Sequence, residues 1–326
     1  MPTNSLEVLV TGGAGFIGSH MILALKAQGY TPIVLDNLSR GRKSAIKATP
    51  FYHAEVGDQK ALQTIFDRHS IGAVMHFASL IDVAESISKP QQYYSNNVQA
   101  TEQLLEVMQK NNVINFIFSS SAAVYGEPQQ VPIHEFHACN PINPYGHSKL
   151  LAEKLIKARA DAAGLRFAIL RYFNAAGADP AGQLGECHTP ESHLIPLALE
   201  VAAGKRAALN IFGNDYPTQD GTCVRDYVHV TDVCQAHLLA LKALMKGGDN
   251  MVLNVGTGKG YSVKQVIEMV EKVTTCPIPV HLMPRRAGDP AVLLADATAI
   301  EKMLQFSSTY SDLETMVRHA WTFHRN

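Results

Sequence analysis

Features that mark several classes of protein are missing from this sequence of 326 residues. No stretch approaches the ~18 consecutive apolar residues that a membrane-spanning helix needs, so we expect no membrane segment. The formal net charge of -1 provides no broad positive field that would attract nucleic acid. The chain also lacks internal repeats, low-complexity tracts and long runs of one charge, which excludes solenoids and charged tails.

The 5 cysteines form no CxxC pair, so the sequence indicates neither a disulfide framework nor a cysteine zinc site, and a reducing cytoplasm suits it. The residues from Met1 to Ser5 carry no basic region of the kind that opens a signal peptide, and we expect none. Among the 14 histidines there is no HExxH motif and no tight cluster with carboxylates. His188 and His193 lie five residues apart in a predicted loop, which is a weak indication of zinc, and we expect no bound metal.

Short apolar runs separated by longer helical patterns dominate the first half of the chain. The runs cover residues 8–10, 33–35, 73–75, 116–118 and 167–170. Runs that are apolar on both faces and are joined by crossovers with helices are typical of parallel strands covered by helices on both sides. The sequence therefore predicts an α/β fold with a Rossmann-like doubly wound parallel sheet in residues 1–175.

After Asn174 the sequence changes to stretches with several glycines and prolines, such as 212–221 and 283–290. We interpret residues 176–326 as a smaller C-terminal α/β lobe that binds the substrate. Part of 228–257 is regular enough to return to the first lobe, so the boundary near 175 is approximate.

A glycine-rich loop follows the first predicted strand. Gly12, Gly15 and Gly18 stand three residues apart between the strand at 8–11 and a helix predicted at 19–28. A dinucleotide loop needs glycine for its tight turn, for the approach of its backbone to the pyrophosphate, and for close packing of helix against strand. The GxxGxxG spacing resembles that of the extended short-chain dehydrogenase/reductase group. It predicts a bound dinucleotide, the alternative being a glycine turn with packing duties alone.

Asp36 ends the second predicted strand, where a carboxylate can accept hydrogen bonds from the adenosine ribose diol. This placement favours NAD over NADP. We interpret Arg40 and Arg42 as surface charges, because Asp36 would repel a 2′-phosphate. Asp58 either approaches the adenine or is an ordinary solvated turn residue.

Tyr145 and Lys149 lie four residues apart in a helix predicted to begin with Asn143 as N-cap and Pro144 as first residue. Side chains with this spacing share one face of a helix and can address the same point. A phenol has a pKa of about 10, which a nearby ammonium and a positively charged nicotinamide would lower toward the range of a general base. YxxxK patterns also occur by chance, and it is the preceding glycine loop that makes this a predicted catalytic pair.

Three serines end the strand predicted at 116–118, at the edge where α/β sheets bind ligands. We select Ser121 as the third catalytic residue, because its hydroxyl could bridge a substrate hydroxyl and Tyr145. For Ser119 the better account is a polar strand end that satisfies backbone groups.

Taken in order along the chain, these motifs resemble the UDP-glucose 4-epimerase family. Further segments carry the resemblance to about Asp296, namely 36–38 (DNL), 76–78 (HFA), 172–174 (YFN), 212–218 (FGNDYPT), 220–222 (DGT), 224–230 (VRDYVHV) and 285–289 (RRAGD). The resemblance implies a homodimeric enzyme of galactose metabolism that keeps NAD bound and interconverts UDP-galactose and UDP-glucose. In that reaction Tyr145 takes the 4-OH proton, hydride passes from C4 to the nicotinamide, and the 4-keto sugar turns before hydride returns to its other face.

The resemblance also assigns residues to both ligands. Arg225 and Arg286 would clamp the diphosphate, to which a planar guanidinium donates paired hydrogen bonds. From the residues alone each arginine is more often an ion-pair partner, Arg225 of Asp226 and Arg286 of Asp289. Further substrate contacts are implied for Ser121, Tyr145, Phe173, Asn174, His193, Leu194, Asp289 and Leu293. Cofactor contacts are implied for Gly12, Gly15, Phe16, Ile17, Gly18, Asp36, Asn37, Asp58, Phe77, Ala78, Asn96, Ser119, Tyr145, Lys149 and Tyr172.

Three positions depart from the usual pattern of the family. Ile81 stands where some members have lysine, so one cationic contact to NAD is missing and the grip on NAD should be weaker. His193 stands where asparagine is found, and its N–H can still donate to phosphate. Leu293 occupies the position at which a large side chain excludes N-acetyl groups from the sugar pocket. Leucine is intermediate in size, so both classes of sugar stay open.

Two other functions share parts of this pattern. A 4,6-dehydratase, or a UDP-uronate epimerase or decarboxylase, would share the first lobe, but a dehydratase needs an acid–base carboxylate pair where this chain has Ala122 and Ala123. A non-catalytic NAD sensor would use the same fold to bind a partner protein. A sensor has no need of the base that Tyr145, Lys149 and Ser121 would form.

Overall fold

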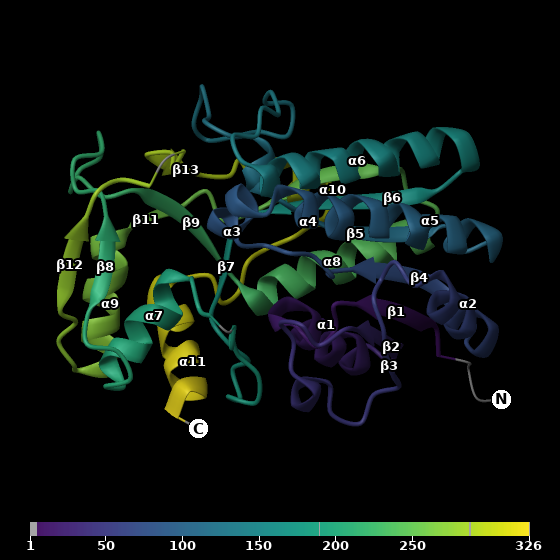
Figure 1. Ribbon diagram of the computed structural model, residues 1–326, viewed down its shortest axis with the longest axis horizontal. Helices are drawn as coiled ribbons and strands as arrows, with labels where there is room; N and C mark the ends of the chain where they lie inside the picture. The colour runs from purple at the N-terminus through teal and green to yellow at the C-terminus, as the bar shows by residue number, and fades with distance from the viewer. Residues whose placement is uncertain (1–4, 189, 287, 326) are drawn as a thin grey trace. The chain divides into compact units, whose positions relative to one another are not determined.

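The computed structural model describes residues 5–188, 190–286 and 288–325 (Figure 1). Met1 to Asn4, where the sequence predicts no signal peptide, and Ala287 of the RRAGD segment lie outside the described residues. By its internal contacts the chain divides into two compact units. The first comprises Met1–Gly126, Cys139–Arg171 and Cys234–Leu253, and the second comprises Glu127–Ala138, Tyr172–Val233 and Asn254–Asn326.

This division differs in one respect from the boundary that the sequence predicts near residue 175. The chain passes from the first unit to the second after Arg171. Residues 234–253, which lie inside the segment expected to return to the first lobe, belong to the first unit. Residues 127–138 belong to the second unit, although the sequence places them in the first. The reason is backbone pairing: the N–H of Ile133 donates to the carbonyl of Leu294 at 2.8 Å, and its own carbonyl accepts the N–H of Asp296 at 2.8 Å.

A seven-stranded sheet forms the centre of the first unit, in the order β10-β6-β5-β4-β1-β2-β3. Its strands are β1 (Glu7–Thr11), β2 (Thr31–Asp36), β3 (Phe51–His53), β4 (Ile71–His76), β5 (Asn115–Ser121), β6 (Arg166–Tyr172) and β10 (Met251–Val255). β1 pairs in parallel with both β2 and β4, so the strand order reverses beside it, which is where doubly wound sheets bind ligands. The predicted fold and five predicted strands are confirmed. β3 was not predicted because three residues are too few to show a periodicity.

Helices of the first unit bury their apolar sides against this sheet. In one core, Leu62, Leu104 and Ile156 of three helices join the strand residues Leu9 and Phe116. Contacts between helices place α6 beside both α4 and α5 (Figure 1). The helical elements are α1 (Phe16–Ala27), η1 (Lys43–Ile46), α2 (Gln59–Arg68), α3 (Val83–Ser88), α4 (Pro90–Tyr94), the π-helical η2 (Ser95–Gln99), α5 (Ala100–Lys110), η3 (Ala122–Val124), α6 (Pro144–Ala163) and α8 (Val230–Met245), which begins in the second unit.

The second unit has smaller sheets than the first and is built around β9 (Val224–His229). β9 pairs with β11 (Gly260–Ser262), β13 (Val292–Leu293) and β7 (Asn174–Ala176), while β8 (Leu209–Phe212) and β12 (Val280–Met283) form a separate parallel pair. Around a core that includes Leu199, Val270 and Val317 lie α7 (Leu194–Ala202), α9 (Val263–Thr274) and α11 (Leu313–Arg325), with α10 (Thr298–Leu304) following β13. The predicted C-terminal α/β unit is therefore present.

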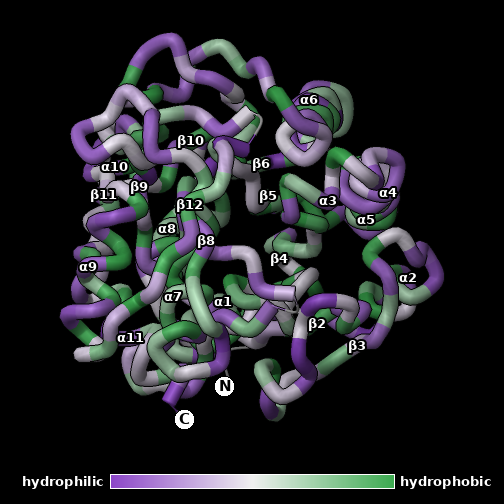
Figure 2. Tube along the Cα trace, turned by 60° about the vertical axis from the view of Figure 1, so that its left-hand side comes forward, coloured by the Kyte–Doolittle hydropathy of each residue, from purple (hydrophilic) through white to green (hydrophobic). Residues whose placement is uncertain are grey.

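α9 shows why these segments become amphipathic helices. Ser262 caps it in a capping box with Gln265, and the buried Val266 and Val270 recur at a spacing of one helical turn. Figure 2 shows hydrophilic and hydrophobic segments alternating along its turns. No helix in the described part of the chain is both long and apolar enough to cross a membrane.

Candidate active site

The glycine loop closes the carboxyl end of β1. Gly12 has a φ of +70°, a left-handed conformation that favours glycine. Gly18, in the first turn of α1, approaches the loop so closely that a Cβ would lie 2.2 Å from the carbonyl oxygen of Gly12. A Cβ on Gly12 would lie 2.4 Å from the backbone nitrogen of Ala78. These contacts hold α1 and the loop after β4 close to the end of β1, as a dinucleotide site requires.

The first turn of α1 is open to an anion. The helix begins at Phe16, three residues earlier than the sequence predicts, with Gly15 as N-cap and neither a capping side chain nor an acidic residue in its first turn. By helix geometry the N–H groups of Phe16, Ile17 and Gly18 have no acceptor inside the helix, and they carry the positive end of its dipole. Such a terminus suits a pyrophosphate, so these residues fit the predicted dinucleotide.

Asp36 ends β2 beside this loop. Its Oδ2 accepts the N–H of Ala14 at 3.0 Å and its Oδ1 accepts the N–H of Leu38 at 2.7 Å. Burial raises the pKa of this carboxyl group, while the two backbone N–H groups lower it. Each oxygen has a second lone pair, so the carboxylate can order the loop and still accept a ribose hydroxyl.

Three other predicted cofactor residues have contacts within the protein. Asp58 is exposed and caps α2 by accepting two backbone N–H groups of its first turn, which agrees with the interpretation as an ordinary turn residue. Asn37 donates to Glu55 Oε2 at 2.9 Å, and Asn96, in η2, donates to Asn97 Oδ1 at 2.9 Å.

Phe77 and Ala78 continue from β4 into the loop that faces Gly12. The N–H of Phe77 donates to the carbonyl of Thr11 at 3.0 Å, and its ring centre lies 4.8 Å from that of His237. Tyr172, the last predicted cofactor residue, ends β6 and falls in the second unit. The structure thus brings the loop residues of β1, β2 and β4 to one edge of the sheet.

Tyr145 lies in the first turn of α6. Asn143 caps this helix by accepting the N–H of Gly146 at 2.8 Å, and Pro144 is its first residue, both as predicted. The side chain of Tyr145 is buried, and its hydroxyl forms a hydrogen bond with Ser121, the last residue of β5. The predicted catalytic hydroxyl and phenol therefore meet.

Lys149 is buried one turn further along α6. Its Nζ donates to the carbonyl oxygen of Ser119 at 2.8 Å and lies 5.0 Å from the ring centre of Phe118. Burial lowers the pKa of Lys149 to about 7, and the negative charge of Glu153 opposes this shift. Ser119 thus positions the ammonium through its backbone.

The predicted low pKa of Tyr145 is not found in the polypeptide itself. Burial raises the pKa of this phenol, and the hydrogen bond from Ser121 only partly opposes it. The sequence argument relied on the charge of the nicotinamide as well as on Lys149, and the loss of water around a phenolate acts against both attractions. The ammonium donates to the carbonyl of Ser119 instead.

A buried ion pair behind these residues was not predicted. Glu153, one turn beyond Lys149 on α6, accepts hydrogen bonds from Arg171 Nε at 2.9 Å and Nη2 at 2.5 Å. Glu153 also accepts the hydroxyl of Ser120 at 2.5 Å, and Arg171 donates to the hydroxyl of Tyr125 at 3.1 Å. Glu153 lies four residues after Lys149 on the predicted helix, and this spacing was the sequence signal that could have indicated Glu153 as part of the buried group.

His76, which the sequence singles out only as part of a motif, links two strands and a helix. One ring nitrogen lies 2.7 Å from Thr11 Oγ1 and the other 3.0 Å from Thr101 Oγ1. Burial and the charge of Lys149 lower the pKa of His76 to about 3, so the ring is neutral. His76 is therefore a structural residue behind the loop of β1.

In the second unit, β9 and β13 place three of the predicted substrate residues together. Arg225 lies on β9, its backbone partner on β13 is Leu293, and its Nη2 forms an ion pair with Asp289. The ion pairs that the sequence left as the alternative, Arg225 with Asp226 and Arg286 with Asp289, are not found among the described residues, where Arg225 pairs with Asp289. Asp226 is fully buried and accepts the N–H of Thr257 and other backbone groups of neighbouring loops.

Arg286, Phe173 and Asn174 are further predicted substrate residues of the second unit. The guanidinium carbon of Arg286 lies 3.9 Å from the ring centre of Phe212, and the side chain is exposed. Asn174 begins β7 and pairs with Tyr227 of β9, and the preceding Phe173 is buried. The N–H donors of a guanidinium lie in its own plane, so those of Arg286 remain able to bind an anion beside the ring.

His193 is the N-cap of α7, directly before Leu194, and makes no side-chain cap. Its Nδ1 instead lies 2.8 Å from Glu186 Oε1 and 3.0 Å from Glu191 Oε1. These carboxylates raise the pKa of His193 well above its ordinary value against the effect of burial. His188 joins the same group, so the expectation of no tight histidine–carboxylate cluster is wrong.

Comparison with known proteins places the chain among close relatives. The model of the NAD dependent epimerase/dehydratase family matches residues 8–256. A UDP-glucose 4-epimerase of Halalkalibacterium halodurans is 51% identical over 320 residues, which are 98% of this chain and 96% of that protein.

Solved structures agree with these matches over nearly the whole chain. The crystal structure of UDP-glucose 4-epimerase from Brucella ovis in complex with NAD has a TM-score of 0.95 at 47% identity and covers 97% of this chain and 98% of its own. The enzyme from Bifidobacterium longum in complex with NAD+ and UDP has a TM-score of 0.92 at 38% identity, covering 98% of both chains.

The burial of Lys149 predicts how stability depends on pH. Its pKa is about 7 in the folded chain and 10.5 when exposed, so between these values the unfolded chain binds more protons and Lys149 makes stability rise with pH. In protein freed of nucleotide, Lys149→Met should therefore flatten the rise in unfolding free energy across this window. Urea denaturation followed by far-UV circular dichroism measures it.

The matched control is Lys154→Met, which replaces an exposed lysine of the same helix. This variant should keep the slope of the wild-type protein. Equal slopes for the wild-type protein and Lys149→Met would mean that burial does not lower the pKa of Lys149.

Proposed function

The chain belongs to the NAD dependent epimerase/dehydratase family, and on that premise we propose how its residues carry out the interconversion of UDP-galactose and UDP-glucose. The family and the cofactor that the motifs predict are confirmed by the relatives at 51% and 47% identity. The reaction is UDP-glucose 4-epimerisation with bound NAD. The observation that carries the mechanism is the buried Tyr145 hydroxyl bonded to Ser121 beside the glycine loop.

The first unit holds NAD. The N–H groups at the start of α1, from Phe16 to Gly18, bind the pyrophosphate, and Asp36 accepts the ribose hydroxyls. When bound, NAD would supply a nicotinamide ring that accepts hydride from C4 of the sugar and, once reduced, returns it. The remaining cofactor contacts that we propose come from Gly12, Gly15, Asn37, Asp58, Phe77, Ala78, Asn96, Ser119, Tyr145, Lys149 and Tyr172.

Tyr145 is the base that removes the proton from the 4-OH, and Ser121 bridges the two oxygens. A serine hydroxyl both donates and accepts, so it can pass a proton in one direction during oxidation and in the other during reduction. Lys149 stabilises the phenolate by its positive charge, which burial makes more effective because the local dielectric is low. Its hydrogen bond to the Ser119 carbonyl, 2.8 Å long, fixes the position of that charge.

The second unit holds the UDP-sugar while the keto sugar turns. Arg225 and Arg286 bind the diphosphate as planar donors, and the ion pair of Arg225 with Asp289 aims the guanidinium before substrate arrives. Sugar and nucleotide contacts come from Phe173, Asn174, His193, Leu194, Asp289 and Leu293. We thus propose that the predicted lobe 1–175 binds NAD and that the predicted lobe 176–326 binds the substrate. The segments that the structure assigns to the other unit are the exceptions.

The alternative of a 4,6-dehydratase is disfavoured by the same site. Ala122 and Ala123 form η3 directly after Ser121. Their methyl groups cannot carry the protons that elimination of water requires.

Two properties of the whole protein are further proposals. We propose a cytoplasmic enzyme, because the 5 cysteines form no CxxC pair and indicate no disulfide framework, which suits a reducing compartment. We propose a homodimer, supported by the exposed side chains of Val83 and Ile87 on α3, which are 42% and 60% accessible. Light scattering of the purified protein should give the mass of two chains, and Ile87→Asp should give that of one. A single-chain mass for the wild-type protein would reject the dimer.

Purified protein should convert UDP-galactose to UDP-glucose, and Tyr145→Phe should lower this rate by roughly 10²- to 10⁴-fold, the usual share of a general base. The variant should keep its NAD, because the ring remains and only a hydroxyl is lost. A coupled assay for UDP-glucose and the absorbance of nucleotide released on denaturation measure the two effects.

The matched control is Tyr52→Phe, which removes a hydroxyl bonded to His69 outside the proposed site and should leave the rate unchanged. An active Tyr145→Phe would reject Tyr145 as the base. Turnover only after NAD is added would agree with the weaker grip expected from Ile81, whereas no interconversion under any condition would reject the activity.

Leu293 should control which sugars are accepted. Leu293→Tyr enlarges the side chain and should lower the rate with UDP-N-acetylgalactosamine relative to UDP-galactose by at least about tenfold, the scale of steric discrimination in a pocket. Rates with both sugars measure the ratio. Leu282→Tyr, at an exposed leucine of β12, is the control. An unchanged ratio in Leu293→Tyr would remove this residue from the sugar pocket.

A further inference from the structure

The loop before α7 gathers two histidines and two glutamates, of which the proposed reaction uses only His193, as a substrate contact. Glu186, His188, Glu191 and His193 each direct one ligand atom to a common point, and these four atoms all lie within 4.8 Å of one another. All four belong to the second unit, and their sequence spacing repeats, because each glutamate precedes a histidine by two residues.

The distances within the group match those between ligands of a small cation. Nδ1 of His188 lies 3.2 Å from Glu186 Oε1 and 3.9 Å from Glu191 Oε2. Nδ1 of His193 lies 2.8 Å from Glu186 Oε1 and 3.0 Å from Glu191 Oε1. Nitrogen and oxygen ligands at 2.0–2.2 Å from a tetrahedral zinc ion are roughly 3.3–3.6 Å apart, within the observed spread.

The two carboxylates of this group are buried, and a bound cation would neutralise their charge. The side chains of Glu186 and Glu191 are only 7% and 5% exposed. Among the described residues their ion pairs are with His188 and His193, and none is with lysine or arginine. Two buried carboxylates require compensating positive charge, which either protonated imidazoles of the cluster or one divalent cation can supply.

The position of one imidazole nitrogen adds to this. Nδ1 of His188 is inaccessible to solvent, and its contact with Glu186 at 3.2 Å falls short of good hydrogen-bond geometry. A buried imidazole nitrogen without a well-formed hydrogen bond is costly, whereas a nitrogen that ligates a metal needs none.

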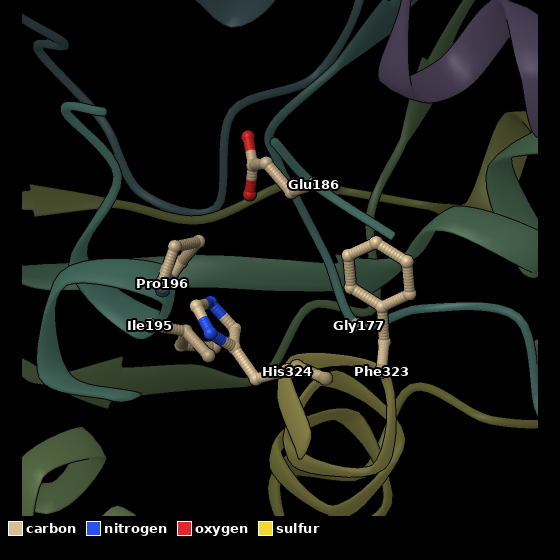
Figure 3. Close-up of a pocket in the computed structure, with 7 residues that line it drawn as sticks. Gly177, Glu186, Ile195, Pro196, Phe323 and His324 are labelled. Atoms are coloured by element: carbon tan, nitrogen blue, oxygen red, sulfur yellow. The ribbon is translucent and has the colours of Figure 1, made fainter. Parts of the chain in front are cut away.

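Glu186 also borders a small apolar pocket. Figure 3 shows its carboxylate with Ile195, Pro196 and Phe323 around this space, and with His324 coming from α11. Apolar surroundings of this kind exclude water from a metal and strengthen the bonds of its charged ligands.

We propose that Glu186, His188, Glu191 and His193 bind one zinc ion. Two imidazoles and two carboxylates are typical zinc ligands, whereas magnesium and calcium select oxygen ligands alone. With four protein ligands the site is closed, so the ion has a structural role. It ties residues 186–188 to residues 190–193 and thereby fixes the entry into α7 at His193 and Leu194. The proposal departs from the sequence expectation of no bound metal, and it goes beyond the epimerase reaction.

Metal binding is tested without any measurement of turnover. The full-length protein, prepared without a polyhistidine tag, is treated with a chelator, desalted and titrated with Zn²⁺ against a chromophoric chelator. Elemental analysis after gel filtration gives the stoichiometry. We expect one zinc ion per chain. In a parallel sample, Co²⁺ should give the strong visible absorption of a four-coordinate site without a thiolate charge-transfer band.

Variants assign the ligands. His188→Asn and Glu191→Gln should each weaken Zn²⁺ binding by more than about 100-fold, because loss of a direct ligand exceeds the 10- to 100-fold effect of residues behind the ligands. His281→Asn, at an exposed histidine of β12, and Cys187→Ser, beside the cluster in sequence, are the controls and should bind zinc as the wild-type protein does.

Several outcomes would overturn the proposal. These are less than one zinc ion per chain in the wild-type protein, equal affinity in His188→Asn and His281→Asn, or loss of zinc in Cys187→Ser. The Co²⁺ spectrum of the wild-type protein decides the matter even where a variant fails to fold, because a thiolate band or a six-coordinate spectrum would contradict the proposed ligands. A failure of the epimerase assays would leave these results unaffected.

Discussion

The buried ammonium of Lys149 is the constraint on which the order of the first unit depends. It lies at the end of β5, 2.8 Å from the Ser119 carbonyl, and the carboxylate of Glu153 one turn away on α6 offsets its charge. Glu153 is in turn held by Arg171 of β6 and by a hydroxyl of β5. A buried charge left without a partner is strongly destabilising, so the network fixes α6 against both strands. Tyr145, on the same helix, is thereby held against Ser121.

The two units prepare their ligand groups in different ways. In the first, backbone geometry does most of the work, since a left-handed Gly12 and the close approach of Gly18 create the loop and leave helix N–H groups facing outward. In the second, charged side chains are oriented by one another, as Arg225 is by Asp289. A backbone site has little conformational freedom to lose on binding, whereas an ion pair must exchange part of its interaction for the ligand.

Local patterns carried the predictions that succeeded. The strand runs, the glycine turn after β1 and the cap at Asn143 are set by short segments of chain, where periodicity and helix geometry decide the outcome. The partner of Arg225 lies 64 residues away, and no local rule selects Asp289 over the adjacent Asp226. The cluster around His193 is close in sequence, but only the path of an irregular loop determines that its side chains converge. The pKa of Tyr145 depends on burial, which is a property of tertiary packing.

That last difference bears on when the base can act. In the polypeptide itself burial favours the neutral forms of both members of the pair, because it raises the pKa of Tyr145 and lowers that of Lys149. A protonated phenol cannot take the proton of a sugar hydroxyl. A positive charge brought next to Tyr145 favours the phenolate by direct attraction, and a low dielectric enlarges that effect. The positively charged nicotinamide of oxidised NAD is such a charge, and its reduced form is not. In the proposed mechanism, burial of the pair would make the basicity of Tyr145 follow the oxidation state of the cofactor. The phenol would keep its proton while the ring is reduced and would release it to the sugar oxygen as hydride returns to C4.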